Sequence, residues 1–173
     1  LSGSRGFSHA DFASRHPGGS LGMRLVQVEE KMRSVEHCRL ARTDDTVRQI
    51  FARPLPSRRT GAVMIVGTND QLVGIFTDSD LARLFENRQD NALDQPIHEV
   101  MTIHPISVLE GTRLEDAVAL LESRRLSELP VVDANGRPRG LIDVVDLVGA
   151  DFSATAKETN SPNPEQREHS SAA

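Results

Sequence analysis

The sequence of 173 residues is poor in cysteine and in aromatic residues. Trp and Tyr are absent, Phe occurs six times, and Cys38 is the single cysteine. One cysteine excludes an internal disulfide framework and a cysteine-based zinc site. It also favours a reducing compartment, so we expect a cytoplasmic protein. The scarcity of aromatic side chains argues against binding of single-stranded nucleic acid by base stacking.

Basic residues are also in the minority, with 20 Lys and Arg against 25 Asp and Glu and a net charge of −5. Without a basic block, the chain is a poor candidate for binding duplex nucleic acid. The six His are scattered without the spacing of metal ligands, so we expect no metal site. No apolar run approaches the ~20 residues that cross a bilayer, and we expect no membrane partner.

Two stretches of the chain resemble each other at a spacing of 66 positions. Residues 58–81 align with residues 124–147, and the alignment contains seven identical pairs: Arg58/Arg124, Arg59/Arg125, Val66/Val132, Asn69/Asn135, Gly74/Gly140, Asp80/Asp146 and Leu81/Leu147. Such a repeat indicates two copies of one supersecondary unit.

In the second copy, apolar residues at helical spacing predict a helix from residue 112, opened by a capping box of Thr112 and Glu115. Strands at 129–133 and 140–142 follow, joined by a turn at 134–136, and a short helix closes the unit at 143–148. The first copy predicts a helix near Asp45, strands at 62–66 and 72–76, and a helix at 78–86. Pro54 and Pro56 require its first helix to be short or broken.

A weak strand precedes the first helix of each copy, at 39–41 and 106–108, so the order in each unit is β-α-β-β-α. One unit of about 60 residues has a marginal core, and its strands leave one face exposed. We therefore predict an α+β fold in which two units pack face to face about a pseudo-twofold axis, with their sheets covered by the helices.

The stretch Gly74-Ile75-Phe76-Thr77-Asp78-Ser79-Asp80 resembles the G-h-h-[ST]-x-x-D signature of CBS domains, which occur as tandem pairs. Leu129-Pro130-Val131-Val132-Asp133 resembles the strand that precedes this signature. The resemblance places one CBS domain at 27–88 and a second at 96–151. It implies that nucleotides bind in the clefts between the repeats and regulate an attached domain.

The signature lies where a strand ends and a helix begins. Helix N-terminal amides and a Thr hydroxyl favour a phosphate there, and an Asp in the first turn can accept both hydroxyls of a ribose. Thr77 and Asp80 are therefore the candidate nucleotide-binding residues. In the alternative interpretation, Thr77 caps the helix and Asp80 complements the helix dipole. In the second copy Asp143 would repel a phosphate, whereas Asp146 retains the ribose role.

The first 26 residues contain Phe7-Ser8-His9-Ala10-Asp11-Phe12-Ala13-Ser14-Arg15-His16-Pro17-Gly18-Gly19-Ser20-Leu21-Gly22. This stretch resembles the end of the SIS (sugar isomerase) domain of arabinose 5-phosphate isomerases, where it leads into a CBS pair. The resemblance implies interconversion of D-ribulose 5-phosphate and D-arabinose 5-phosphate, for Kdo synthesis toward lipopolysaccharide or capsule. His16 then acts as a proton carrier in the intact enzyme; alternatively it packs beside the Pro-Gly-Gly turn.

The chain alone is not expected to be an enzyme, because the rest of the SIS domain would lie upstream. Residues 152–173 have the composition of a disordered tail. Cys38 is interpreted as a small buried hydrophobe. Arginines of both copies, Arg137 and Arg139 among them, are interpreted either as partners for phosphate or as solvated surface.

Three functional interpretations remain. In the first, the pair is a regulatory module that requires no cofactor, responds to an adenine nucleotide or a CMP-sugar, and acts on the SIS domain of the same chain within a homo-oligomer. In the second, the pair is a purely structural dimerisation module, which the departures at Met64, at Asp143 and at Pro54 and Pro56 favour. A third possibility attaches the pair to another SIS-domain isomerase or to a transcriptional regulator.

Overall fold

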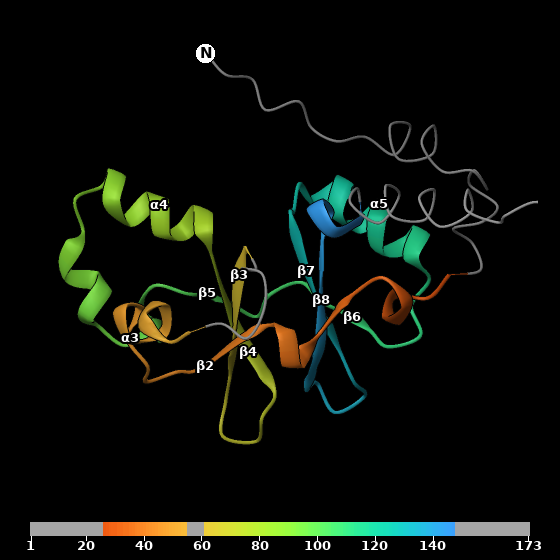
Figure 1. Ribbon diagram of the computed structural model, residues 1–173, viewed down its shortest axis with the longest axis horizontal. Helices are drawn as coiled ribbons and strands as arrows, with labels where there is room; N and C mark the ends of the chain where they lie inside the picture. The colour runs from red at the N-terminus through yellow and green to blue at the C-terminus, as the bar shows by residue number, and fades with distance from the viewer. Residues whose placement is uncertain (1–25, 55–60, 148–173) are drawn as a thin grey trace, which may run out of the picture.

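The computed structural model describes residues 26–54 and 61–147, which form two four-stranded sheets packed against each other (Figure 1). The first repeat contributes β2 (Arg39–Arg42), α3 (Val47–Ala52), β3 (Ala62–Val66), β4 (Leu72–Thr77) and α4 (Asp78–Glu86). The second contributes β6 (Val108–Leu109), α5 (Leu114–Arg124), β7 (Glu128–Val132) and β8 (Pro138–Asp143). Residues 144–147 then begin a further helix.

The linking segments contain two short strands, β1 (Arg33–Ser34) and β5 (Thr102–Ile103), and four 3₁₀ helices. The 3₁₀ helices are η1 (Val28–Glu30), η2 (Val35–His37), η3 (Asp90–Asp94) and η4 (Ile97–Glu99). Within each sheet the first strand of a repeat pairs in parallel with the second, and the second and third form an antiparallel hairpin. The β-α-β-β-α order predicted for each unit is therefore confirmed.

The two corresponding helices differ in length and in how they begin. Thr46 caps α3 through a capping box with Gln49, and α3 ends after six residues because Arg53 is extended before Pro54. The capping box predicted at Thr112 and Glu115 is wrong: α5 begins at Leu114 with no side-chain cap. The backbone N–H of Leu114 instead donates to the carbonyl of Val26, 2.9 Å away, so the linker supplies the missing acceptor.

Each sheet buries alternate residues on its two faces. Toward the helices of the first repeat, the strands direct Val63, Ile65 and Phe76 into a core that also holds Val47 and Ile50. The second repeat has its own core beneath α5. The opposite faces meet in a third cluster formed by Cys38, Ala62, Met64, Ile75 and Leu141. Because this cluster draws residues from both sheets, the predicted face-to-face packing is confirmed.

The two repeats exchange their short linking strands. β1 precedes the first repeat but pairs with β8 of the second, so that Ser34 lies opposite Gly140. β5 precedes the second repeat but pairs with β4 of the first, so that Ile103 lies opposite Gly74. The reciprocal pattern produces the pseudo-twofold relation. It also means that neither sheet is complete without a strand that belongs, in sequence, to the other half.

The tips of the two hairpins also touch, since the N–H of Leu72 donates to the carbonyl of Gly136 at 2.8 Å. In Figure 1 both tips lie at the bottom, while β4 and β8 run upward to the start of the helices that follow them. The signature motifs and the hairpin tips thus lie at opposite ends of the molecule. Within the described residues, no helix has the length and apolar character needed to cross a membrane.

Candidate functional site

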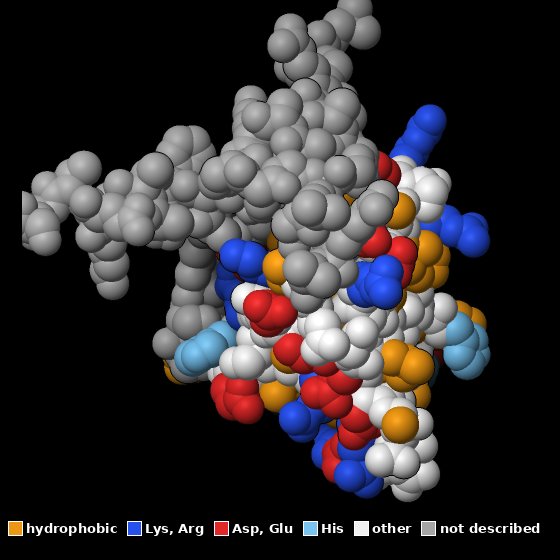
Figure 2. Space-filling model, turned by 90° about the vertical axis from the view of Figure 1, so that its right-hand side faces the viewer, with side chains coloured by type: hydrophobic (Ala, Val, Ile, Leu, Met, Phe, Trp, Pro, Cys, Tyr) orange, Lys and Arg blue, Asp and Glu red, His pale blue; other side chains and the backbone are white. Residues whose placement is uncertain are grey.

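The surface offers no simple guide to a functional site. On the face shown in Figure 2, acidic and basic side chains are intermixed over the lower part, with apolar side chains scattered toward one edge. This mixture matches a chain in which charged residues of both signs are abundant. The candidate site is therefore built from the signature residues and their contacts.

Thr77 and Asp80 lie at the junction of β4 and α4 and form a reciprocal capping box. The hydroxyl of Thr77 accepts from the N–H of Asp80 at 3.2 Å and donates to Asp80 Oδ2 at 2.9 Å. Asp80 Oδ2 also accepts from the N–H of Thr77, and Asp80 Oδ1 accepts from Arg83 at 3.0 Å. The structure thus brings the two predicted residues together as helix caps, in the arrangement that the alternative interpretation describes.

This arrangement leaves Asp80 with unused acceptor capacity. Its side chain is 13% exposed, and a carboxylate offers about four lone-pair sites, of which three are occupied here. The Thr77 hydroxyl has already donated its only hydrogen to Asp80. A ligand phosphate would therefore meet Thr77 as a donor only if the hydroxyl turned away from Asp80.

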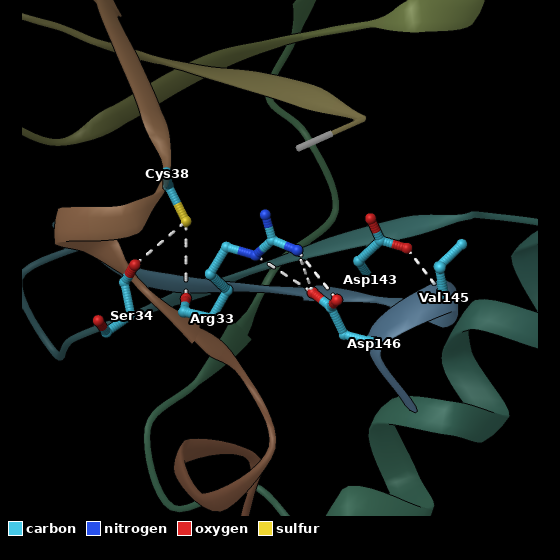
Figure 3. Close-up of polar contacts among 6 residues, drawn as sticks. All are labelled: Arg33, Ser34, Cys38, Asp143, Val145 and Asp146. Atoms are coloured by element: carbon cyan, nitrogen blue, oxygen red, sulfur yellow. Dashed lines mark hydrogen bonds and ion pairs between the residues drawn. The ribbon is translucent and has the colours of Figure 1, made fainter. Parts of the chain in front are cut away.

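In the second repeat, Asp146 is held by an arginine from the far end of the described chain. Arg33 of β1 contacts the Asp146 carboxylate through two of its nitrogens (Figure 3). Arg33 Nη2 lies 2.6 Å from Oδ2 and 2.9 Å from Oδ1, and Arg33 Nε lies 3.2 Å from Oδ2. The two side chains are 12% and 24% exposed. Asp143 lies close by and accepts from the N–H of Val145 at 2.8 Å, so it caps the helix that follows β8.

Glu128, which no sequence motif indicated, lies between the two signatures. It is opposite Asp143 in the β7–β8 pairing, and its carboxylate covers Gly61 so closely that a Cβ there would overlap it. The carbonyl of Gly61 in turn accepts from the N–H of Asp78 at 2.8 Å. Burial, with the nearby negative charges of Asp143, Asp78 and Asp80, raises the pKa of Glu128 to about 7.

A sequence signal for Glu128 existed, because the repeat aligns it with Ala62, a buried strand residue. An acidic residue at a position that is buried and apolar in the other copy costs desolvation energy, so this difference between the copies marks Glu128.

The raised pKa of Glu128 makes stability depend on pH. Because the folded protein holds this proton more tightly than the unfolded chain, the free energy of unfolding should fall as pH rises from about 4.5 to about 7. The side chain is only partly buried, so we expect a fall of about 1–2 kcal/mol. Glu128→Gln should remove it, which makes the variant more stable than the parent at about pH 8 and equal to it near pH 5.

Urea unfolding followed by far-ultraviolet circular dichroism at several pH values measures this effect. The matched control is Glu86→Gln, an exposed Glu at the end of α4, which should leave the pH profile of the parent unchanged. A profile for Glu128→Gln that falls in parallel with the parent between about pH 5 and 8 would show that Glu128 does not titrate in this range.

Cys38 is buried, its thiol faces the carbonyls of Arg33 and Ser34 at 3.6 and 3.4 Å (Figure 3), and burial raises its pKa to about 11. The interpretation of Cys38 as a small buried hydrophobe is confirmed. Within 26–54 and 61–147, no three His, Cys, Asp or Glu side chains group as metal ligands. His16 and the predicted tail lie outside the described residues.

Curated relatives match most of this chain. Arabinose 5-phosphate isomerase GutQ of Escherichia coli K12 is 35% identical over 154 residues, which covers 84% of this chain and 45% of the relative. Arabinose 5-phosphate isomerase KdsD of Pseudomonas aeruginosa is 33% identical over 147 residues, covering 84% and 44%. The chain therefore spans less than half the length of these relatives.

Solved structures share the fold. The structure of CBSX2 in complex with AMP superposes with a TM-score of 0.61 at 26% identity, covering 75% of this chain and 98% of that one. The model of the CBS domain family matches this chain twice, at residues 36–87 and 97–153. Two matches in tandem agree with the two sheets, the exchanged strands and the paired signatures. The chain belongs to the CBS domain family and contains a tandem pair of CBS domains.

Proposed function

We propose that this CBS pair is the nucleotide-responsive regulatory part of a D-arabinose 5-phosphate isomerase. The observation that carries the proposal is the extent of the match to GutQ and KdsD. Each of these matches covers 84% of the chain and therefore extends beyond residues 36–153, which contain the two CBS domains. The resemblance of residues 1–26 to the end of a SIS domain supports the same attachment. His16 is then the proton carrier of the attached isomerase.

The nucleotide response is assigned to Thr77, Asp80 and Asp146. AMP is bound by the CBS pair of CBSX2, which shares this fold. Asp80 keeps acceptor capacity for ribose hydroxyls at the N-terminus of α4, where backbone amides favour an anionic group. The effector is an adenine nucleotide or a CMP-sugar such as CMP-Kdo, because both classes supply a ribose and a phosphate. No cofactor is required for this role.

The contacts of Asp146 suggest how a bound nucleotide would act on an attached domain. Ribose hydroxyls that bind Asp146 would displace Arg33, and the released guanidinium would face the ligand phosphate. Arg33 belongs to β1, which follows the segment that leads from residues 1–26 into the pair. Binding would therefore loosen or reposition that segment, and a shift there is the means by which the pair would influence the catalytic domain.

A structural dimerisation module is the second candidate, favoured by a specific observation. Thr77, Asp80 and Asp146 all have hydrogen-bond partners within the protein, so the fold needs no ligand to satisfy them. In this alternative the pair only holds catalytic domains in register within a homo-oligomer. The two candidates differ in whether the chain binds a nucleotide at all.

Calorimetric titration with AMP and with CMP-Kdo separates them. We expect saturable heat with at least one nucleotide, and Asp80→Asn should weaken that binding by about tenfold. The matched control is Thr46→Val, which removes the same kind of capping box from α3, outside the signature. It should cost about 1 kcal/mol of stability and leave the affinity unchanged. Absence of heat with every nucleotide would favour the structural module.

In the longer protein that the proposal implies, isomerisation of ribulose 5-phosphate should respond to the same nucleotide. The response should be reduced in the Asp80→Asn variant and retained in the Thr46→Val variant. Binding without any change in isomerisation would remove the regulatory role while leaving the nucleotide site in place.

A further inference from the structure

A pocket of about 540 Å³ lies between β2 and the β7–β8 hairpin, at the end of the molecule opposite the signatures. Both repeats line it, so we call it the hairpin pocket. Its apolar wall includes Val35, Leu40 and Pro138, and Leu40 is 39% exposed although it is a large hydrophobic residue. A volume of this size is typical of sites for small organic molecules, which combine an apolar wall with a few polar groups.

The charged lining of the hairpin pocket consists of four arginines and three aspartates: Arg42, Arg53, Arg137, Arg139, Asp45, Asp70 and Asp133. Two of the aspartates are neutralised by arginines of the same lining. Arg53 contacts Asp45 at 2.6 Å, and Arg42 contacts Asp70 at 2.7 Å. These pairs fix the side chains and cancel most of the charge they bring.

The third aspartate is satisfied by backbone. Asp133 Oδ1 accepts from the N–H groups of Arg137 and Asn135, at 2.9 and 2.8 Å, and these bonds hold its pKa below the usual range. The Arg139 guanidinium contacts Glu110 at 2.9 Å, outside the pocket lining. Within 26–54 and 61–147, the Arg137 guanidinium has no hydrogen bond or ion pair. The pocket is thus left with one guanidinium whose hydrogen-bond donors are unused, while the charge of the Asp133 carboxylate offsets part of its own.

The pseudo-twofold relation shows that the fold does not require these charges. At the corresponding positions of the other half stand uncharged residues: Leu109 for Arg42, Gly136 for Asp70, Gly67 for Asp133, Gln71 for Arg137 and Val73 for Arg139. The corresponding strand and hairpin of the other half therefore fold without any of these five charges. These arginines therefore occur at only one of two equivalent places in the duplicated fold. This asymmetry points to a role specific to the hairpin pocket.

We propose that the hairpin pocket binds a small phosphorylated metabolite, with the phosphate on Arg137 and the carbon skeleton against Leu40 and Pro138. A guanidinium presents a planar set of donors that matches the oxygens of a phosphate. This assignment stands independently of the proposed function, since it involves none of the signature residues.

Titration of the 173-residue chain with ribose 5-phosphate, ribose and inorganic phosphate, followed by amide NMR spectra, tests the proposal. We expect saturable shifts with ribose 5-phosphate at the amides of Gly136, Arg137 and Arg139, a weaker response to phosphate, and none to ribose. Arg137→Gln, which installs the residue of the other half, should weaken ribose 5-phosphate binding by about tenfold. The matched control is Arg124→Gln, an exposed arginine on α5 that should leave it unchanged.

Riburonate, in which C5 is a carboxylate instead of a phosphorylated hydroxymethyl group, distinguishes the two anions and should bind more weakly than ribose 5-phosphate. Shifts confined to the signature end, equal affinity of parent and Arg137→Gln, or absence of shifts at millimolar ligand would each overturn the proposal. None of these outcomes bears on nucleotide binding at Asp80, which the calorimetric titration tests separately.

Discussion

Replacement of Arg33 by Met is expected to lower the free energy of unfolding by about 2–3 kcal/mol. The substitution keeps an unbranched stem but removes the guanidinium that contacts both oxygens of Asp146. The Asp146 carboxylate, 24% exposed, then loses its contacts with Arg33. Removal of one partner from a fully buried pair costs more, about 3–5 kcal/mol, and partial exposure reduces that figure. Urea unfolding followed by circular dichroism measures the loss.

A matched control for burial exists within the same chain. Arg48 contacts Asp94 in the same two-pronged way, at 2.6 and 3.0 Å, but both side chains are about 60% exposed. Arg48→Met should therefore cost less than about 1 kcal/mol. In a double-mutant cycle, Arg33→Met combined with Asp146→Asn should lose less stability than the sum of the two single variants. Equal losses for Arg33→Met and Arg48→Met would show that burial of the pair contributes nothing.

Gly140→Ala is expected to destabilise the protein by about 2–4 kcal/mol, because β1 leaves no room for a side chain there. A Cβ on Gly140 would overlap the carbonyl oxygen of Arg33 and lie 2.6 Å from Met32 Sδ. The carbonyl belongs to the backbone of β1, so relief requires the whole strand to move away from β8. Urea unfolding measures this loss of stability. Hydrogen exchange should also show that the β1 amides of the variant are less protected than those of the parent.

The pseudo-symmetric position supplies the control. The atoms nearest to a Cβ on Gly74 all belong to the side chain of Met101, whose thioether can turn aside. Gly74→Ala should cost about 1 kcal/mol or less, since reduced freedom of the unfolded chain offsets part of the overlap. A Gly140→Ala variant as stable as Gly74→Ala would mean that β1 yields freely, and that the exchanged strand does not hold the two repeats together.

Local sequence signals were sufficient for the elements of each repeat. The strands 62–66 and 72–76 and the helix 78–86 were predicted from alternation and helical spacing, and β3, β4 and α4 agree with them to within one residue. The proline at 54 correctly predicted a short α3. These features depend on neighbours in sequence, which is why periodicity and turn residues identify them.

Local signals failed where the acceptor or donor comes from elsewhere in the chain. Thr112 and Glu115 have the spacing of a capping box, yet Val26 supplies the acceptor for the N–H of Leu114 and the helix begins two residues later. Asp146 has the position of a ribose-binding residue, but Arg33 was not foreseen as its partner. In both cases the competing group approaches from the linker before the first repeat.

The repeat and its periodicity are enough to predict two like units, the elements of each unit and the positions of the CBS signatures. Three features follow only from the folded structure: which strand completes which sheet, the contact of Arg33 with Asp146 across 113 positions, and the place of Glu128 beside Gly61 of the other half. Repetition and periodicity reflect the local preferences of a segment. Contacts between distant segments depend on packing, which alternation of residue types does not encode.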